Sequence, residues 1–178
     1  LWMNEMGKDK TIDLCAWFNE QPRLTARINT IKISIEDCLK ELQDLGWTVE
    51  QDTYIPEVVY INAHQGHLEK AKPVIDGHIT FMDKASMLVA HVVNPQPGER
   101  ILDCCAAPGG KSMHMASLMN NTGAIMSCDI YDHKLDLMNH NAQRLGVSIV
   151  STKLQDGRYL PDNWKEQFDR VLVDAPCS

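Results

Sequence analysis

Apolar residues recur at the start of the chain with the periods of a helix and then of a strand. Residues 4–20 carry apolar side chains at helical spacing among polar ones, and Gly7 interrupts this segment. Residues 22–33 alternate instead between an apolar and a polar side. The apolar side holds Leu24, Ala26 and Ile28, and the polar side holds Arg23, Thr25, Arg27 and Asn29. The pattern predicts a helix followed by a half-buried strand.

A second helix is marked at both of its ends. Ser34 stands where an N-cap is expected, Asp37 follows three residues later, and Gly46 ends the segment. Its apolar face consists of Ile35, Leu39 and Leu42. The run 57–63 predicts another strand, so this part of the chain reads as a small β-α-β unit that ends near residue 80.

The second half of the chain alternates regularly between strands and helices. Four apolar strand segments occur: ERILDCC, AIMSCD, a strand within VSIVSTKLQD, and FDRVLVDAP. Two helical segments lie among them, at 111–121 and 131–146. This order implies parallel strands joined by right-handed crossovers. We place a domain boundary between Gly77 and Asn94, and assign residues 1–80 and 81–178 to the two domains.

Composition narrows the class of protein without naming a function. The 178 residues are 44% hydrophobic and 23% charged, as in an ordinary globular protein. We find no apolar run of membrane-spanning length and no signal-peptide pattern, so we expect no membrane partner. The first residue is not Met, which suggests a piece of a longer protein. The net charge of -7 weakly disfavours a nucleic-acid partner, although a local basic face remains compatible with it.

The six cysteines do not form a disulfide framework. None belongs to a C-x-x-C pair, and no secretion signal is present. Reduced thiols and a cytoplasmic location are therefore expected. We interpret Cys15, Cys38, Cys104 and Cys128 as structural residues.

The stretch LDCCAAPGGKSMH, residues 102–114, concentrates unusual residues, but it makes a poor metal site. Cys104 and Cys105 are adjacent, so on a strand they point to opposite faces. His114 has no second ligand pair at zinc spacing, and we interpret His64 and His67 as solvated loop residues. We predict no metal.

Phosphate-binding and dinucleotide-binding loops do not fit this stretch either. Gly110, Lys111 and Ser112 match the end of a P-loop, but Cys105 stands where its first glycine belongs, and G-x-G-x-x-G is absent. What remains is a glycine-rich turn between a strand and a helix, where open α/β sheets bind ligands. Taken alone, a tight turn without a ligand is a serious alternative.

Three acids at strand ends favour a ligand-binding turn over a turn without a ligand. Asp129, Asp156 and Asp174 each close an apolar strand segment, and the carboxyl ends of parallel strands meet at one edge of a sheet. Asp129 follows Gly110 at the distance where such folds place an acid that binds ribose hydroxyls. Three such acids beside a glycine loop favour a nucleoside-bearing cofactor over turn residues alone.

Several motifs, in this order, resemble one enzyme family. LDCCAAPGGK, CDIYDHKL, NAQRLGV and FDRVLVDAPCS closely resemble the RsmB/Sun (Fmu) family of RNA cytosine-C5 methyltransferases, part of the NOL/NOP2/Sun superfamily. Upstream, PRLTARINTIK and GHITFMDKASMLVA also resemble family segments. The resemblance implies an α/β fold: a partial Rossmann-like S-adenosylmethionine-dependent methyltransferase core, preceded by a small RNA-recognition-like α+β domain.

The resemblance also implies the cofactor and its contacts. S-adenosyl-L-methionine would lie with its methionine and carboxylate end along Cys105, Ala106, Ala107, Pro108, Gly109, Gly110 and Lys111. Asp129 would hold the ribose, and Asp156 would lie by the adenine. Asp174 would lie between the cofactor and the target base.

The implied chemistry needs two cysteines. A thiolate that attacks carbon 6 of cytosine makes carbon 5 nucleophilic, and Asp174 is suited to hydrogen-bonding the ring. Cys177 resembles the cysteine that, in the RNA family, assists product release. The nucleophile belongs to a Thr-Cys-Ser type motif further downstream, which is absent from these residues, so we expect this chain to be inactive alone.

The resemblance implies RNA as the partner, with ribosomal (16S) RNA as the first choice, and two alternatives stay open. One is a non-catalytic RNA-binding or assembly module in which Arg23, Arg27 and Lys32 contact phosphate. The other is a methyltransferase that acts on transfer RNA or protein. The last strand is an apolar edge, so we expect self-association or marginal stability. Met82 stands where family members usually have Gln.

Overall fold

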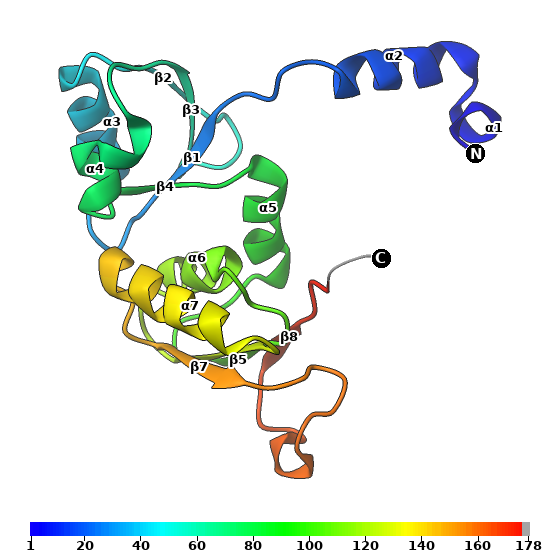
Figure 1. Cartoon of the computed structure of the whole chain (residues 1–178), viewed down its shortest axis with the longest axis vertical. Coiled ribbons are helices and arrows are strands. Elements are labelled where there is room, and N and C mark those ends of the chain that lie inside the picture. Colours follow the sequence, from blue (N-terminus) through cyan, green and yellow to red (C-terminus); the bar gives the residue numbers. More distant parts are fainter. Residues whose placement is uncertain (176–178) are drawn as a thin grey trace.

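The protein is described by a computed structural model that covers residues 1–175. Two four-stranded sheets follow one another along the chain, the first above the second in Figure 1. Ahead of them lie two short helices, α1 (Trp2–Met6) and α2 (Lys8–Phe18), with Gly7 between them at φ 83°. The predicted interruption at Gly7 is therefore confirmed. Both helices extend away from the two sheets (Figure 1).

The first sheet is antiparallel throughout, in the order β2-β3-β1-β4. Its strands are β1 (Thr25–Ile28), β2 (Thr48–Gln51), β3 (Val58–Ala63) and β4 (Ile79–Phe81). Its helical segments are α3 (Ile35–Asp44), η1 (Leu68–Lys70) and α4 (Lys72–Ile75). A β-α-β-β-α-β order with this pairing is the ferredoxin-like arrangement. We predicted β1, α3 and β3, and missed the short strands β2 and β4.

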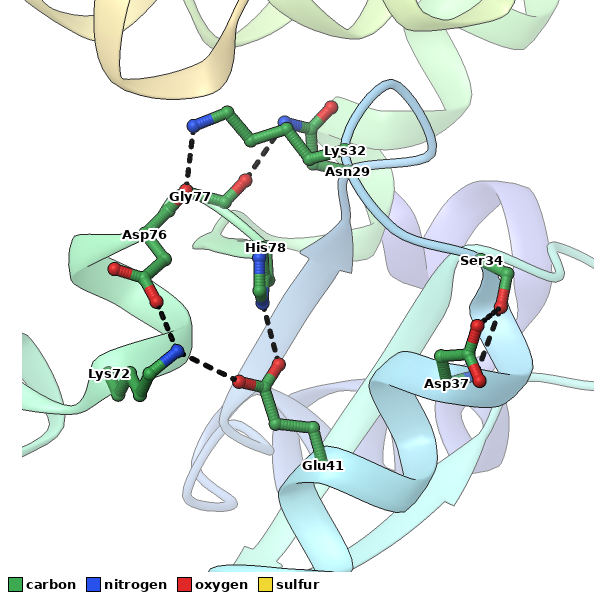
Figure 2. Close-up of polar contacts among 9 residues, drawn as sticks. All are labelled: Asn29, Lys32, Ser34, Asp37, Glu41, Lys72, Asp76, Gly77 and His78. Carbon is green, nitrogen blue, oxygen red and sulfur yellow. Dashed lines mark hydrogen bonds and ion pairs between the residues drawn. The ribbon is translucent and has the colours of Figure 1, made fainter.

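Helix α3 begins as its sequence predicts. The backbone N–H of Asp37 donates to the Ser34 hydroxyl over 3.1 Å, and the same hydroxyl bonds the Asp37 carboxylate (Figure 2). Cys38 and Leu42 are buried on its inner face. The cap satisfies a backbone donor that the helix leaves free, and the apolar face fixes α3 on the sheet.

The second sheet is parallel throughout, in the order β7-β6-β5-β8. Its strands are β5 (Arg100–Asp103), β6 (Ala124–Asp129), β7 (Val150–Leu154) and β8 (Arg170–Leu172). The helices are α5 (Lys84–Val93), α6 (Gly110–Leu118) and α7 (Asp132–Leu145), and η2 (Asp162–Trp164) precedes β8. The predicted alternation and parallel pairing are confirmed. The strand order reverses at β5, and ligands bind α/β sheets at such points.

The polar side of β1 is not a solvated face. Arg27 and Asn29 are fully buried. Met87 of helix α5 packs with Val58, the strand partner of Arg27, and Asn29 donates to the carbonyls of Gly77 and Leu145. Lys32 is exposed but donates to two backbone carbonyls, and the exposed Arg23 pairs with Glu50. The hypothesis that Arg27 contacts phosphate is therefore wrong.

Two further sequence expectations concern thiols and membranes. Cys38, Cys104 and Cys128 are buried as predicted for structural residues, but Cys15 is exposed, so that interpretation of Cys15 is wrong. The apolar residues around Cys15 lie on a helix that buries almost none of them. Among residues 1–175, no helix combines the length and apolarity that crossing a bilayer requires. The boundary between residues 80 and 81 stays a prediction.

Candidate cofactor site

Four chain segments meet at the carboxyl edge of the second sheet. The loop 104–109 follows β5, Asp129 ends β6, and Asp156 and Asp174 lie just beyond β7 and β8. Because the four strands are parallel neighbours, these segments open on the same side. The structure thus brings the predicted acids and the glycine-rich loop to one edge.

The glycine-rich loop is fixed by backbone hydrogen bonds and by close packing. The N–H of Ala106 donates to the carbonyl of Cys128 over 2.8 Å, which ties the loop to β6. Gly109 has φ 96°, and a Cβ placed there would lie 3.1 Å from Cγ of Met138. Glycine is therefore required both by the backbone conformation and by the approach of α7.

Lys111 and Asp174 join two of the four segments. The Nζ atom of Lys111, in the first turn of α6, forms an ion pair with the carboxylate of Asp174 beyond β8. Both side chains keep contact with solvent. A cation and an anion thus lie side by side at the carboxyl edge of the sheet between β5 and β8, where the strand order reverses.

Asp103 is a site residue that we missed. Its carboxyl is buried at the end of β5, Oδ2 accepts from the Ser112 hydroxyl over 2.7 Å, and Ser112 in turn accepts from Ser127. Oδ1 is buried without a hydrogen-bond partner in the described part of the chain. Burial raises the pKa of Asp103 to about 6. The signal was present, since Asp103 also closes an apolar strand.

The other two acids differ in what holds them. Asp129 is largely buried, and its Oδ1 accepts from the backbone N–H of Tyr131 over 3.0 Å. Asp156 is gripped by the guanidinium of Arg158 through bonds of 3.0 and 2.7 Å. These hydrogen bonds lower the pKa of Asp156 to about 2. Asp129 is therefore the carboxylate with the freer acceptor oxygens.

The cysteines around the loop are poor nucleophiles. Burial raises the pKa of Cys128 to about 12, and it also raises the pKa values of Cys104 and Cys105. For Cys105 the neighbouring carboxylates of Asp103 and Asp129 add to this effect. A thiol with a raised pKa carries little thiolate at neutral pH. Cys177 lies outside the described residues.

Met82 reaches the loop from the first sheet. Its sulfur lies 3.7 Å from the position that a Cβ on Gly110 would occupy. The segment after β4 therefore borders the start of α6. A thioether at this point offers an apolar surface in place of the polar amide that the resemblance leads one to expect.

Tertiary structure also assembles Glu57, His91 and His114, whose ligand atoms lie within 4.8 Å of one another. Sequence spacing gave His114 no such partners. Glu57 Oε1 accepts from both imidazoles, over 2.6 and 2.8 Å, and the charge of buried Arg27 acts on Glu57. A divalent cation would add two positive charges beside a buried guanidinium, so we read the cluster as a hydrogen-bonded interdomain contact.

Comparison with protein families matches both halves of this architecture. Residues 90–178 match the family described as 16S rRNA methyltransferase RsmB/F. Residues 1–66 match the RsmF/B-like methyltransferase ferredoxin-like domain. The chain belongs to the RsmB/F methyltransferase family. Its two sheets are thus the ferredoxin-like domain and part of the S-adenosylmethionine-dependent core of that family.

Individual relatives agree with this assignment. A Bacillus subtilis protein named "Probable ribosomal RNA small subunit methyltransferase B" is 35% identical over 99% of this chain, which spans 39% of that protein. Human tRNA (cytosine(72)-C(5))-methyltransferase NSUN6 is 39% identical over 59% of this chain and 25% of its own length. A Pyrococcus horikoshii methyltransferase homologue of known structure has a TM-score of 0.86 at 28% identity, covering 97% of this chain and 56% of its own.

Proposed function

We propose that the whole protein transfers a methyl group from S-adenosyl-L-methionine to carbon 5 of cytosine in RNA, with small-subunit ribosomal RNA as the acceptor. The observation that carries this proposal is the arrangement at the carboxyl edge of the second sheet. A glycine-rich loop, the buried Asp103 and the Lys111–Asp174 pair meet there, where the strand order reverses. The family and the Bacillus relative support the ribosomal acceptor, and the name of NSUN6 makes transfer RNA the alternative.

The residues at the edge fit the cofactor chemically. The unpartnered Oδ1 of Asp103 suits an ammonium group, and the loop at Gly109 and Gly110 lets a ligand approach the backbone. The carboxylate of Asp129 suits the two ribose hydroxyls. When bound, the cofactor supplies an electrophilic methyl group. We retain Cys105 to Lys111 for its methionine end and Asp156 for its adenine.

Asp174 lies, in this proposal, between the cofactor and the target base, and Lys111 pairs with it from the cofactor side. Both side chains are accessible to solvent at the carboxyl edge of the sheet, where a cytosine extruded from RNA would meet the methyl group. Asp174 hydrogen-bonds the ring as charge develops at nitrogen 3, and Lys111 holds the Asp174 carboxyl in place. Cys177, three residues after Asp174, is proposed as the release helper. A cytoplasmic location also remains a proposal.

Binding of S-adenosylhomocysteine tests the cofactor assignment. Titration calorimetry should give measurable affinity for the chain, and Asp129→Ala should weaken it roughly tenfold or more, because hydrogen bonds to a charged carboxylate are lost. Asp136→Ala is the matched control, since Asp136 is an exposed acid on α7, the helix that follows Asp129. Equal affinity in both variants would remove Asp129 from the site.

We also infer that the chain self-associates through strand β8. This strand lies at the edge of the sheet, and Val171 on it is 54% exposed. An unpaired apolar edge pairs readily with another strand. Sedimentation velocity should show association that grows with concentration and that Val171→Lys removes. Val92→Lys, at a valine on α5 that is even more exposed, should leave association unchanged. A monomer at every concentration contradicts the inference.

A further inference from the structure

The ferredoxin-like domain grips the C-terminal end of helix α7 through two side chains. The amide nitrogen of Asn29 donates to the carbonyls of Gly77 and Leu145, both over 2.8 Å. The ammonium of Lys32 donates to the carbonyls of Asp76 and Arg144, over 2.7 and 2.6 Å. Each donor thus bridges a turn of its own domain to the end of α7. Those end carbonyls have no partner within the helix itself.

The turn that shares these donors is fixed within the small domain (Figure 2). Lys72 forms an ion pair with Asp76 over 2.5 Å, and His78 is bonded to Glu41 of helix α3 over 2.6 Å. In the opposite direction, the guanidinium of Arg144 on α7 donates to the carbonyl of Val74 over 2.8 Å. The turn therefore offers α7 an anchored surface.

The other end of α7 forms a wall of the proposed cofactor site. Leu135 and Met138, in its first two turns, pack directly against Ala106 in the glycine-rich loop. The helix begins just after Asp129, whose carboxylate accepts from the N–H of Tyr131. Its 14 residues make it roughly 21 Å long. A continuous chain of contacts therefore runs from Lys32 and Asn29 to the loop.

We propose that Asn29 and Lys32 are positioning residues for the cofactor site, and that docking of the ferredoxin-like domain and cofactor affinity are thermodynamically coupled through α7. The proposal rests on the function proposed above. It gives the small domain a second task beside any contact with RNA. Since coupling between two sites is reciprocal, a bound cofactor must also tighten the clamp.

Lys32→Met is the variant that tests this proposal. Lys32 is exposed, so the substitution removes the two charge-assisted bonds without opening a cavity in the core. Lys40→Met is the matched control, because Lys40 is exposed on α3 and its ammonium forms no hydrogen bond or ion pair within residues 1–175. Lys32→Arg should keep the properties of the unmodified chain, since a guanidinium can also donate to two carbonyls.

Two measurements are expected to agree. Affinity for S-adenosylhomocysteine should fall roughly fivefold or more in Lys32→Met and stay unchanged in Lys40→Met. Without ligand, Lys32→Met should show faster hydrogen exchange than the unmodified chain in the loop 104–110 and in 129–135, at the N-terminal end of α7. In the unmodified chain, ligand should slow exchange at 29–32 and 74–78.

Other outcomes separate the two proposals. Faster exchange confined to 143–147 and 74–78, with unchanged affinity, would mean a purely structural contact and would overturn the coupling. If the unmodified chain does not bind S-adenosylhomocysteine, the proposed function fails. Exchange at 104–110 in Lys32→Met, which needs no ligand, then still decides whether the clamp positions the loop.

Discussion

Gly77→Ala is expected to destabilise the protein more than any other single methyl addition considered. Gly77 has φ 72°, and a Cβ there would lie 2.3 Å from the carbonyl oxygen of Arg144. Because that atom belongs to the backbone of α7, relief requires the two domains to move apart. We expect a loss of about 3 kcal/mol, from backbone strain and from the broken clamp together.

Gly66→Ala separates these two causes. Gly66 has nearly the same φ, 73°, but a Cβ there meets nothing within 4 Å. Its loss should be about 1 kcal/mol, from the left-handed conformation alone. Urea unfolding of both variants measures the difference, which for a chain of this size corresponds to a melting-temperature gap of roughly 4 to 8 °C. Equal losses would show that α7 yields to the methyl group without cost.

Asp103→Asn is expected to stabilise the protein at pH 7 while weakening cofactor binding. Burial raises the pKa of Asp103 from 3.8 to about 6, so the ionised carboxylate is less favourable in the folded than in the unfolded state. Asparagine keeps the shape without the charge. The gain at pH 7 is at most about 3 kcal/mol, from a shift of about two pKa units. Calorimetry should show affinity for S-adenosylhomocysteine reduced roughly tenfold or more, as a charged acceptor is lost.

The pH dependence fixes the sign of this effect. Well below pH 3.8 the carboxyl is protonated in both states, so the unmodified protein and Asp103→Asn should be nearly equal in stability. As the pH rises from about 4 to about 6, the folded state holds the proton longer, and the unmodified protein loses stability. Urea unfolding at pH 4, 5.5 and 7 follows this gap. Asp136→Asn, at an exposed acid, should show none, and a constant gap for Asp103→Asn would contradict the raised pKa.

Local sequence predicted most of the secondary structure because the signals were local. The hydroxyl of Ser34 and the acid at Asp37 mark the start of α3, and Gly146 ends α7 in a left-handed conformation. Strand β2 (TVEQ) buries no residue and strand β4 (ITF) has only three, and neither lies within a longer segment that the sequence pattern marked. Strands β1 and β8 are equally short, but they lie within the longer patterns 22–33 and FDRVLVDAP.

The gathering of the proposed site was also predictable. Asp129, Asp156 and Asp174 each follow an apolar strand segment, and parallel pairing alone brings such positions to one edge. Which oxygens are free was not predictable. Arg158 takes the carboxylate of Asp156, whereas Asp103, in a strand that attracted attention only for its cysteines, keeps an unpartnered oxygen.

Sequence alone was enough for the alternation of strands and helices in the second half of the chain, for the glycine-rich loop and for the family. Long-range packing buries Arg27 and Asn29, brings Glu57 to His91 and His114, and clamps α7 at its C-terminal end. Alternation along β1 shows which residues share a face, but it does not show what covers that face. The cover comes from segments far along the chain: Asn29 bonds a carbonyl 116 residues away. Polar residues on a strand therefore read as solvated until the domain that buries them is in place.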